Sequence, residues 1–240
     1  MEIKGKRVLV SGAGRGLGRA LVAVLAEAGA RQIIAGTRKP EASEALAATS
    51  TLVMPVQLDV TSDADVSAVA QMGTIDILIN NAGFAGFGNP LTMSFEDIEQ
   101  ELAVNYLGVL RLTRAIAPGM IEQGDGMIVN IATAFAKVNL PLVGTYCATK
   151  AALLSLGQAM RAYLADSGVR VITVMPTTID TDMSSGADVP KMTKEFAAGE
   201  IVAAIRAEAH DPPIGDEAKS ILDEFFKDPV GLEKILMKYR

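Results

Sequence analysis

Tyr146 and Lys150 are the pair of residues in this chain best suited to moving a proton. They stand four positions apart in the segment Tyr-Cys-Ala-Thr-Lys, a spacing that places two side chains on one face of a helix, one turn apart. A free tyrosine titrates near pH ~10, but a neighbouring positive charge favours the phenolate and lowers that pKa. Proton transfer works best when the pKa of the acid is close to the working pH. The pair therefore indicates acid–base chemistry, although the same spacing also occurs on solvated helix faces without a function.

A glycine-rich segment over residues 11–18 joins an apolar, strand-like run to a helix-like run. Glycine lets the backbone approach a pyrophosphate, and the N-terminus of the following helix offers unpaired N–H groups and the positive end of its dipole. Tight turns also use glycine for conformational reasons alone, but the position between strand and helix predicts a nucleotide site. The residues that we expect to contact the cofactor here are Ser11, Gly12, Gly14, Arg15, Gly16, Leu17 and Gly18.

The end of the second expected strand carries basic rather than acidic residues. Thr37 is followed by Arg38 and Lys39, where an acidic residue would accept hydrogen bonds from the adenosine ribose of NAD. Guanidinium groups suit bidentate contact with a phosphate. We therefore predict NADP(H) as the cofactor, with Arg15 and Arg38 flanking its 2′-phosphate; the alternative is that these basic side chains are only solvated.

Two further segments follow expected strands. Asp59, next to Val60, is placed to accept a hydrogen bond from the adenine amino group, or else to cap the helix that starts near Ser62. The run Asn-Asn-Ala-Gly over residues 80–83 leaves room for the adenosine and ribose side of a cofactor, so Asn81, Ala82 and Gly83 are expected to line its site. A simple tight turn would use the same residue types.

Strand-like and helix-like runs alternate along the chain. Strands are expected at 7–11, 32–35, 52–57, 75–80, 127–132 and 169–175, and long helical runs at 16–28, 95–123 and 145–166. Continuous apolar strands suit a parallel sheet that is buried on both faces. The alternation predicts a single α/β domain over residues 1–240 with a Rossmann-like, doubly wound parallel sheet of six to seven strands, any seventh strand near Ile214 being short. Ligands of such sheets bind beyond the carboxyl ends of the strands.

Composition excludes several classes of function. The net charge of −6 argues against general nucleic-acid binding, which needs clustered Lys and Arg. No apolar run approaches the ~18 residues of a membrane span, so no membrane partner is expected. The only cysteine, Cys147, cannot form an intramolecular disulfide, which is compatible with a cytoplasmic location. With one histidine, His210, no metal site is expected.

Taken together, these motifs resemble those of the short-chain dehydrogenase/reductase family along nearly the whole chain. The resemblance rests on residues 11–18, on the intact Asn-Asn-Ala-Gly, on Asn105 within an expected helix, and on Tyr146 with Lys150. It implies a Rossmann-like domain, often in a homodimer or homotetramer. It also implies that Tyr146 exchanges a proton with the substrate oxygen, that Lys150 lowers the pKa of Tyr146 and holds the nicotinamide ribose, and that Asn105 positions a water on the proton path.

The chain departs from the family pattern at two positions. Thr133 stands thirteen residues before Tyr146, where the family normally has a catalytic serine. Threonine keeps the hydroxyl but adds a methyl group that restricts χ1; the alternative is a structural threonine at a strand end. Thr177 replaces the glycine that usually follows the proline corresponding to Pro176. The resemblance still implies that Pro176, Ile179 and Thr181 lie at the nicotinamide.

The resemblance implies an NADPH-dependent oxidoreductase that transfers a hydride reversibly between the nicotinamide and a small carbonyl or alcohol substrate. Residues 177–200 are expected to hold a substrate lid. The alternative is a catalytically weak NADP-binding sensor or scaffold. An apolar pocket without a cationic clamp favours a neutral substrate, and its candidate lining residues are Phe84, Phe87, Phe135, Leu140 and Met183.

Overall fold

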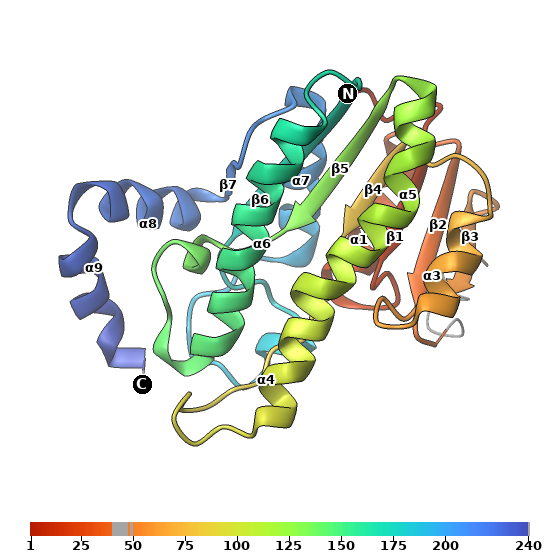
Figure 1. Cartoon of the computed structure of the whole chain (residues 1–240). Helices are drawn as coiled ribbons and strands as arrows, with labels where there is room; N and C mark the ends of the chain where they lie inside the picture. The colour runs from red at the N-terminus through yellow and green to blue at the C-terminus, as the bar shows by residue number, and fades with distance from the viewer. Residues whose placement is uncertain (40–47, 49, 240) are drawn as a thin grey trace.

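Among the residues that the structure describes, seven parallel strands form one sheet at the centre of the molecule (Figure 1). The structure is a computed structural model and describes residues 1–39, 48 and 50–239. The strands are β1 (Arg7–Ser11), β2 (Gln32–Thr37), β3 (Val53–Gln57), β4 (Ile77–Asn80), β5 (Gly126–Ile131), β6 (Val169–Pro176) and β7 (Pro213–Ile214). Their order is β3-β2-β1-β4-β5-β6-β7. The order reverses between β1 and β4, which is where a doubly wound sheet binds its ligand.

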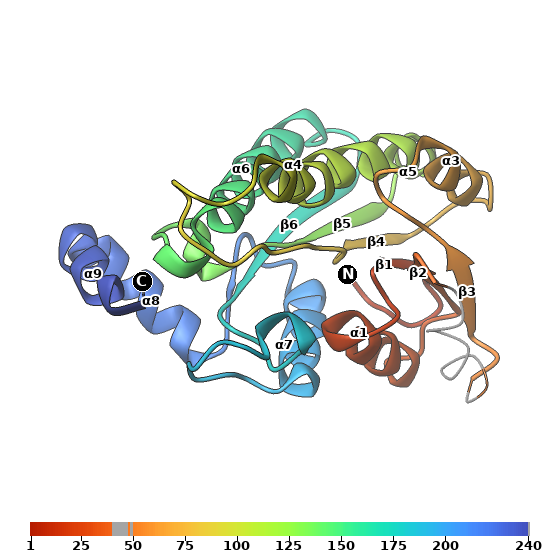
Figure 2. The same ribbon diagram turned by 90° about the horizontal axis from the view of Figure 1, so that it is seen from below.

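Helices cover both faces of this sheet, as the view along it in Figure 2 shows. On one face lie α1 (Gly16–Glu27) and α7 (Lys194–Ala207), and on the other α3 (Asp63–Ala70), α4 (Phe95–Leu102), α5 (Val109–Gln123) and α6 (Gly144–Tyr163). The predicted doubly wound α/β class is thus confirmed.

Alternate residues of the central strands belong to two separate apolar clusters, one on each face of the sheet, because successive strand side chains point to opposite faces. In β4, Ile77 and Ile79 pack with α1 and α7, while Leu78 packs with α3 and α5. All three are fully buried, and each buried side chain of this size contributes about 1.5–3 kcal/mol. The continuous apolar runs seen in the sequence are therefore strands with two buried faces.

One expected helix is interrupted. The run 95–123 is α4 and α5 joined by a π-helix, η1 (Ala103–Gly108), rather than one α-helix. Gly108 packs so closely on Val60 that a Cβ on this glycine would stand 2.6 Å from the Val60 Cγ2. Local composition is helical throughout, so the wider turn follows from tertiary contacts that propensity cannot reveal.

The end of the chain forms an arm that projects beyond β7 (Figures 1 and 2). It consists of α8 (Asp216–Lys227), α9 (Pro229–Leu236) and the 3-10 turn η5 (Met237–Tyr239). Strand β7 has only two residues, so the prediction of a short seventh strand is confirmed. Within the described ranges, no helix has the length and apolar character needed to cross a membrane.

Replacing Gly157 of α6 by alanine is expected to lower the free energy of unfolding by about 1–3 kcal/mol. A Cβ on this glycine would stand 2.3 Å from Thr173 Oγ1 of β6, so the helix must move away from the sheet. Urea unfolding at one protein concentration measures the change. Gly119→Ala in α5 is the matched control: a Cβ there meets nothing within 4 Å, and the substitution is expected to raise stability by up to about 1 kcal/mol. Equal effects of the two substitutions would contradict the packing argument.

Candidate active site

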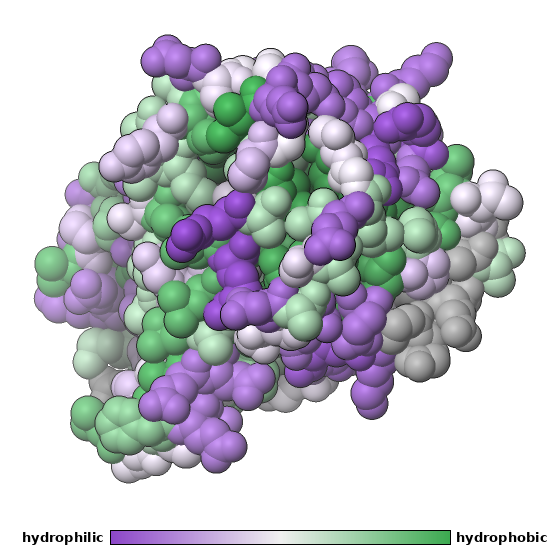
Figure 3. Space-filling model, turned by 45° about the vertical axis from the view of Figure 1, so that its right-hand side comes forward, coloured by the Kyte–Doolittle hydropathy of each residue, from purple (hydrophilic) through white to green (hydrophobic). Residues whose placement is uncertain are grey.

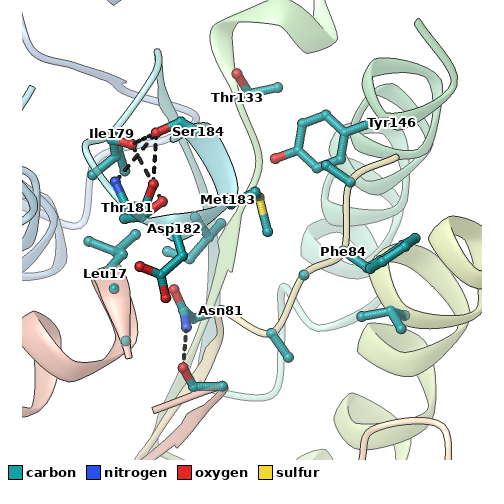
Figure 4. Close-up of a pocket in the computed structure, with 18 of the residues that line it drawn as sticks. Leu17, Asn81, Phe84, Thr133, Tyr146, Ile179, Thr181, Asp182, Met183 and Ser184 are labelled. Atoms are coloured by element: carbon teal, nitrogen blue, oxygen red, sulfur yellow. Dashed lines mark hydrogen bonds between the residues drawn. The ribbon is translucent and has the colours of Figure 1, made fainter. Parts of the chain in front are cut away.

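A pocket of about 810 Å³ opens at the carboxyl ends of the strands. Its wall includes the turn after β1, the ends of β2 and β3, the segments after β4, β5 and β6, and the first turns of α6. These segments are far apart in sequence, and the parallel sheet brings their ends to one edge. Figure 4 shows Thr133 and Tyr146 on one side of the pocket and Leu17 and Asn81 on another.

The glycine turn after β1 has the backbone shape that its sequence predicts. Gly12 and Gly16 adopt positive φ angles of +66° and +53°, which side chains other than glycine rarely tolerate. A Cβ on Gly18 would stand 2.2 Å from the carbonyl oxygen of Gly12. Helix α1 begins at Gly16 without a side-chain cap, so its first N–H groups remain available to an anion.

Ser11 joins this turn to the segment after β4. Its hydroxyl accepts hydrogen bonds from the backbone N–H groups of Asn81 and Ala82, both at 3.0 Å, and donates to the Ile79 carbonyl at 3.4 Å. The side-chain amide of Asn81 also donates to the carbonyls of Ser11 and Gly12, at 2.9 and 3.1 Å. The Asn-Asn-Ala-Gly run is thus tied to the glycine turn rather than being an isolated tight turn.

Basic side chains line the pocket at the end of β2 and in the glycine turn. Arg15, Arg38 and Lys39 line it, together with Thr37 and Asp59. Asp59 Oδ1 accepts hydrogen bonds from the N–H and hydroxyl groups of Thr61. The helix α3 is capped instead by Ser62, which accepts from the Asp65 N–H, so Asp59 is not the cap.

Tyr146 and Lys150 lie one turn apart on α6, with the Lys150 Nζ 5.6 Å from the centre of the Tyr146 ring. The Tyr146 hydroxyl points into the pocket, on the side where Thr133 lies (Figure 4). Lys150 Nζ donates to the Ile131 carbonyl at 2.8 Å. Thr133 donates to the Pro176 carbonyl at 3.0 Å and accepts from the Phe135 N–H at 3.3 Å. All three residues therefore line the pocket near the ends of β5 and β6.

Burial shifts the pKa values of this pair in opposite directions. It raises the pKa of Tyr146 above its usual value of 10, with smaller contributions from Cys147 and Glu101. It lowers the pKa of Lys150 to about 8. The prediction that Lys150 lowers the pKa of Tyr146 is therefore wrong for the protein as it stands. The physical reason is that desolvation penalises the charged form of each group, and the Lys150 charge is not among the contributions that shift the Tyr146 pKa.

Asn105 lies behind the pocket wall, in η1, and is fully buried. Its side-chain amide donates to the Phe84 carbonyl at 2.8 Å and to the Thr149 hydroxyl at 3.0 Å, and accepts from the Phe84 N–H at 2.9 Å. A Cβ on Gly83 would stand 3.4 Å from Asn105 Oδ1 and 3.8 Å from Lys150 Nζ. Asn105 therefore connects the segment after β4, through Phe84, to α6, through Thr149. Its side-chain oxygen and the Lys150 Nζ both lie near Gly83.

Glu101, which the sequence analysis did not identify, is a second buried anchor of the same segment. Its Oε1 accepts the Gly86 N–H at 2.7 Å, whereas its buried Oε2 has no hydrogen-bond partner among the described residues. Burial raises the pKa of Glu101. The carboxyl group thus connects the segment that carries Phe84 and Phe87 to α4.

The segment after β6 covers another side of the pocket. The Ser184 hydroxyl donates to the Ile179 carbonyl at 2.7 Å and holds a short turn, η4 (Asp182–Ser184), beside Thr181 (Figure 4). Asp182 forms an ion pair with Arg15 of the glycine turn at 2.9 Å. From Lys194 onward the chain is α7, whose Ala197 and Ala198 are fully buried. The predicted lid range of 177–200 thus includes part of a core helix, and only residues 177–193 remain candidates for it.

Most of the residues expected at the site do line this pocket. The five candidate substrate residues Phe84, Phe87, Phe135, Leu140 and Met183 are all in its wall, as are Val60, Gly83 and Pro176. Ser11 and Asn105 are not, because they lie behind it and hold it together. Lining residues that the sequence analysis did not single out include Gln100, Leu142, Val143, Asp182, Val189 and Tyr239. No spacing or motif marks them, since only the fold brings them to the pocket.

The part of the chain that the structure describes contains no group of three or more His, Cys, Asp or Glu side chains able to hold a metal ion.

Comparison with known proteins gives the same picture as the geometry. D-erythrulose reductase of Gallus gallus is 37% identical over 185 residues, which are 76% of this chain and 75% of that protein. A short chain dehydrogenase from Burkholderia cenocepacia, solved in complex with NADP, has a TM-score of 0.92 at 36% identity and covers 98% of this chain and 99% of its own. A 3-ketoacyl-(acyl-carrier-protein) reductase from Brucella melitensis, complexed with NADH, has a TM-score of 0.82 at 26% identity and covers 88% of this chain and 96% of its own.

The model of the short chain dehydrogenase family matches residues 6–190, which include the glycine turn, Asn105, Thr133, Tyr146 and Lys150. The protein is therefore an oxidoreductase of the short chain dehydrogenase family.

Proposed function

We propose that this protein is an NADPH-dependent oxidoreductase that transfers a hydride reversibly between the nicotinamide and a carbonyl or alcohol substrate. One observation carries the proposal: the Tyr146 hydroxyl, Thr133 and Lys150 line the same pocket as the glycine turn. An NADP-binding sensor or scaffold without turnover is not favoured, because it would need none of these groups at the pocket.

The pocket fits a dinucleotide phosphate. A Cβ on Gly12 would stand 2.9 Å from the Cα of Ala82, so the turn offers backbone rather than side chains to a pyrophosphate. Arg38 and Lys39 follow β2, and no carboxylate stands among residues 37–39. We assign the 2′-phosphate of NADP to Arg38 and Arg15, and the Burkholderia cenocepacia relative in complex with NADP supports this choice over NADH.

When bound, NADPH supplies the hydride. In reduction Tyr146 donates a proton to the substrate oxygen, and Thr133 turns its hydroxyl from the Pro176 carbonyl to hydrogen-bond the same atom. In oxidation Tyr146 accepts the proton. Lys150 holds the nicotinamide ribose and carries a positive charge at neutral pH. Asn105 holds Phe84 and positions a water toward Lys150 through the remaining lone pair of its side-chain oxygen. Pro176, Ile179 and Thr181 border the nicotinamide.

Residues 1–240 form one domain, because the apolar clusters on the two faces share one sheet. Residues 177–193 close over the substrate.

Exposed apolar residues on α4 and η1, including Phe95, Leu102 and Leu107, support a homodimer or homotetramer. On the face in Figure 3, hydrophobic residues are interspersed among hydrophilic ones. A cytoplasmic location is supported by the single, buried cysteine.

Tyr146→Phe is expected to lower kcat for ketone reduction at least about a hundredfold, because the ring remains and only the proton donor is lost. NADPH oxidation followed by absorbance measures this, and the dissociation constant of NADPH is expected to stay unchanged. Tyr163→Phe is the matched control, since Tyr163 is 91% exposed at the end of α6. Near-native turnover by Tyr146→Phe would contradict the mechanism.

Arg38→Leu is expected to weaken NADPH binding about 10- to 100-fold, the value of a lost charge-assisted hydrogen bond. NADH lacks the 2′-phosphate, so its affinity is expected to change little. Equilibrium titration with both cofactors makes the comparison. Arg19→Leu, which removes an exposed arginine of α1 outside the pocket wall, is the control. Equal loss for both cofactors would show that Arg38 does not recognise the phosphate.

Ketone reduction is expected to slow as pH rises through about 8, because Lys150 is charged below this pKa and neutral above it. The same shift predicts the opposite trend for stability. Between about 8 and 10.5 the unfolded chain holds the lysine proton and the folded chain does not, so the free energy of unfolding rises with pH in that window. Turnover and urea unfolding measured in the same buffers separate the two effects. Turnover that stays constant well above pH 8 would exclude Lys150 as the titrating group.

A further inference from the structure

The chain's C-terminal arm reaches the pocket from outside the part matched by the family model. The match ends at residue 190, whereas α8, α9 and η5 span residues 216–239. Leu232 and Leu236 of α9 pack with Val138, Leu140 and Cys147. Tyr239, in η5, lines the pocket itself. The arm is therefore a wall of the site as well as an extension of the fold.

Apolar side chains make up most of the pocket wall outside the glycine turn and its basic neighbours, with Gln100, Thr177, Thr178 and Ser184 as polar residues among them. The segments after β4, β5 and β6 and the turn η3 (Pro141–Val143) all contribute, and we call this part of the wall the apolar half of the pocket. Its members are Phe84, Ala85, Phe87, Phe135, Leu140, Leu142, Val143, Met183, Ala187, Val189 and Tyr239. Three phenylalanines and a tyrosine here provide flat surfaces that suit an aromatic ring.

Charged groups of the pocket wall belong to the other half. Among the described lining residues they are Arg15, Arg38, Lys39, Asp59, Lys150 and Asp182. Asp182 approaches the apolar half most closely along the chain, but its carboxylate pairs with Arg15. Lys238 stacks on the Tyr239 ring, with its Nζ 4.9 Å from the ring centre, and does not itself line the pocket. A charged substrate would thus lose water without gaining a partner.

Two of the hydroxyl groups near the apolar half already have partners in the protein. Thr177 donates to Glu217 of α8 at 2.8 Å. Ser184 donates to Ile179. Beyond the group that receives its carbonyl oxygen, a polyhydroxylated substrate would therefore have mainly the Gln100 amide and the Thr178 hydroxyl of the wall as partners.

We propose that the substrate is a neutral ketone whose larger substituent is an apolar group, best an aromatic ring, and that Tyr239 is the specificity-determining residue in contact with that group. This inference rests on the proposed function of the same pocket. It sets the protein apart from relatives named for polyhydroxy substrates, such as D-erythrulose reductase.

Two matched pairs of ketones test the substrate class with NADPH and the full-length protein. Acetophenone is expected to exceed 4-acetylbenzoate in kcat/KM by at least about a hundredfold, because the carboxylate is buried without a cation. 2-Butanone is expected to exceed erythrulose, which has the same four-carbon skeleton, by at least about tenfold. A preference for either polar member would overturn the proposal.

Variants of Tyr239 test its role. Tyr239→Ala is expected to raise KM for acetophenone about tenfold with little change in kcat, since it removes contact area and no reacting group. Tyr239→Phe is expected to behave like the parent, and a large effect would show that the hydroxyl binds a polar substituent, which contradicts the proposal. Tyr163→Ala, at an exposed position outside the pocket wall, is the control, and thermal unfolding checks that all variants fold.

The small diketone 2,3-butanedione separates failure of this inference from failure of the proposed function. Reduction of the diketone without reduction of acetophenone would overturn only the inference. No oxidation of NADPH with any carbonyl would overturn both. Saturation-transfer NMR of acetophenone with the NADP-loaded protein gives a readout independent of turnover, and Tyr239→Ala is expected to weaken that signal; an unchanged signal would remove Tyr239 from the site.

Discussion

The connection between two strand ends through Ser11 is the constraint on which the pocket depends. β1 and β4 are neighbours in the sheet but lie on opposite sides of the point where the strand order reverses. Across that point Asn81 donates two hydrogen bonds to Ser11, from its backbone N–H to the hydroxyl and from its side-chain amide to the carbonyl. A Cβ on Gly18 would collide with the Gly12 carbonyl and the Asn81 amide. Buried donors and acceptors that pair in this way are costly to separate. The hydrogen bonds thereby fix the turn after β1 and the segment after β4 relative to each other, and both present backbone groups to the pocket.

The electrostatics of the site follow from burial more than from pairing. Lys150 is buried and Tyr146 is half-buried, and desolvation shifts the pKa of each in the direction of its neutral form. For tyrosine the neutral form is the protonated one, which is the form that a proton donor must have. For lysine the neutral form is the deprotonated one, which brings its pKa to about 8. A pocket that keeps the phenol protonated and leaves the lysine able to titrate is suited to reduction, and the same desolvation strengthens every hydrogen bond to a reacting oxygen.

How much of this the sequence could predict depends on the range of the interactions involved. Strands such as β1 and β4 were predictable because a continuous apolar run is itself the consequence of burial on two faces. The glycine turn and its neighbours were predictable because strand ends of a parallel sheet must meet. The π-helix η1, the buried Glu101 and the lining Tyr239 were not, since each depends on a contact between segments distant in the chain. The pKa of Tyr146 was predicted with the wrong sign for the same reason: the spacing to Lys150 is local, whereas the burial that dominates comes from the whole fold.

The two halves of the pocket differ in what holds them. The half with the glycine turn and the charged side chains is made of strand ends and the turns directly after them, which neighbouring strands fix in place. The apolar half is made of longer connections and of the C-terminal arm, which is tied back by Thr177 to Glu217 and by the cluster around Leu232. Thr177 stands where the family pattern has glycine, so a departure from that pattern supplies one of the bonds that holds the arm. Substitutions in the arm can therefore reshape the apolar half of the pocket while leaving the strand ends in place, but because Leu232 and Leu236 share a cluster with Cys147 and Tyr146, they also reach α6.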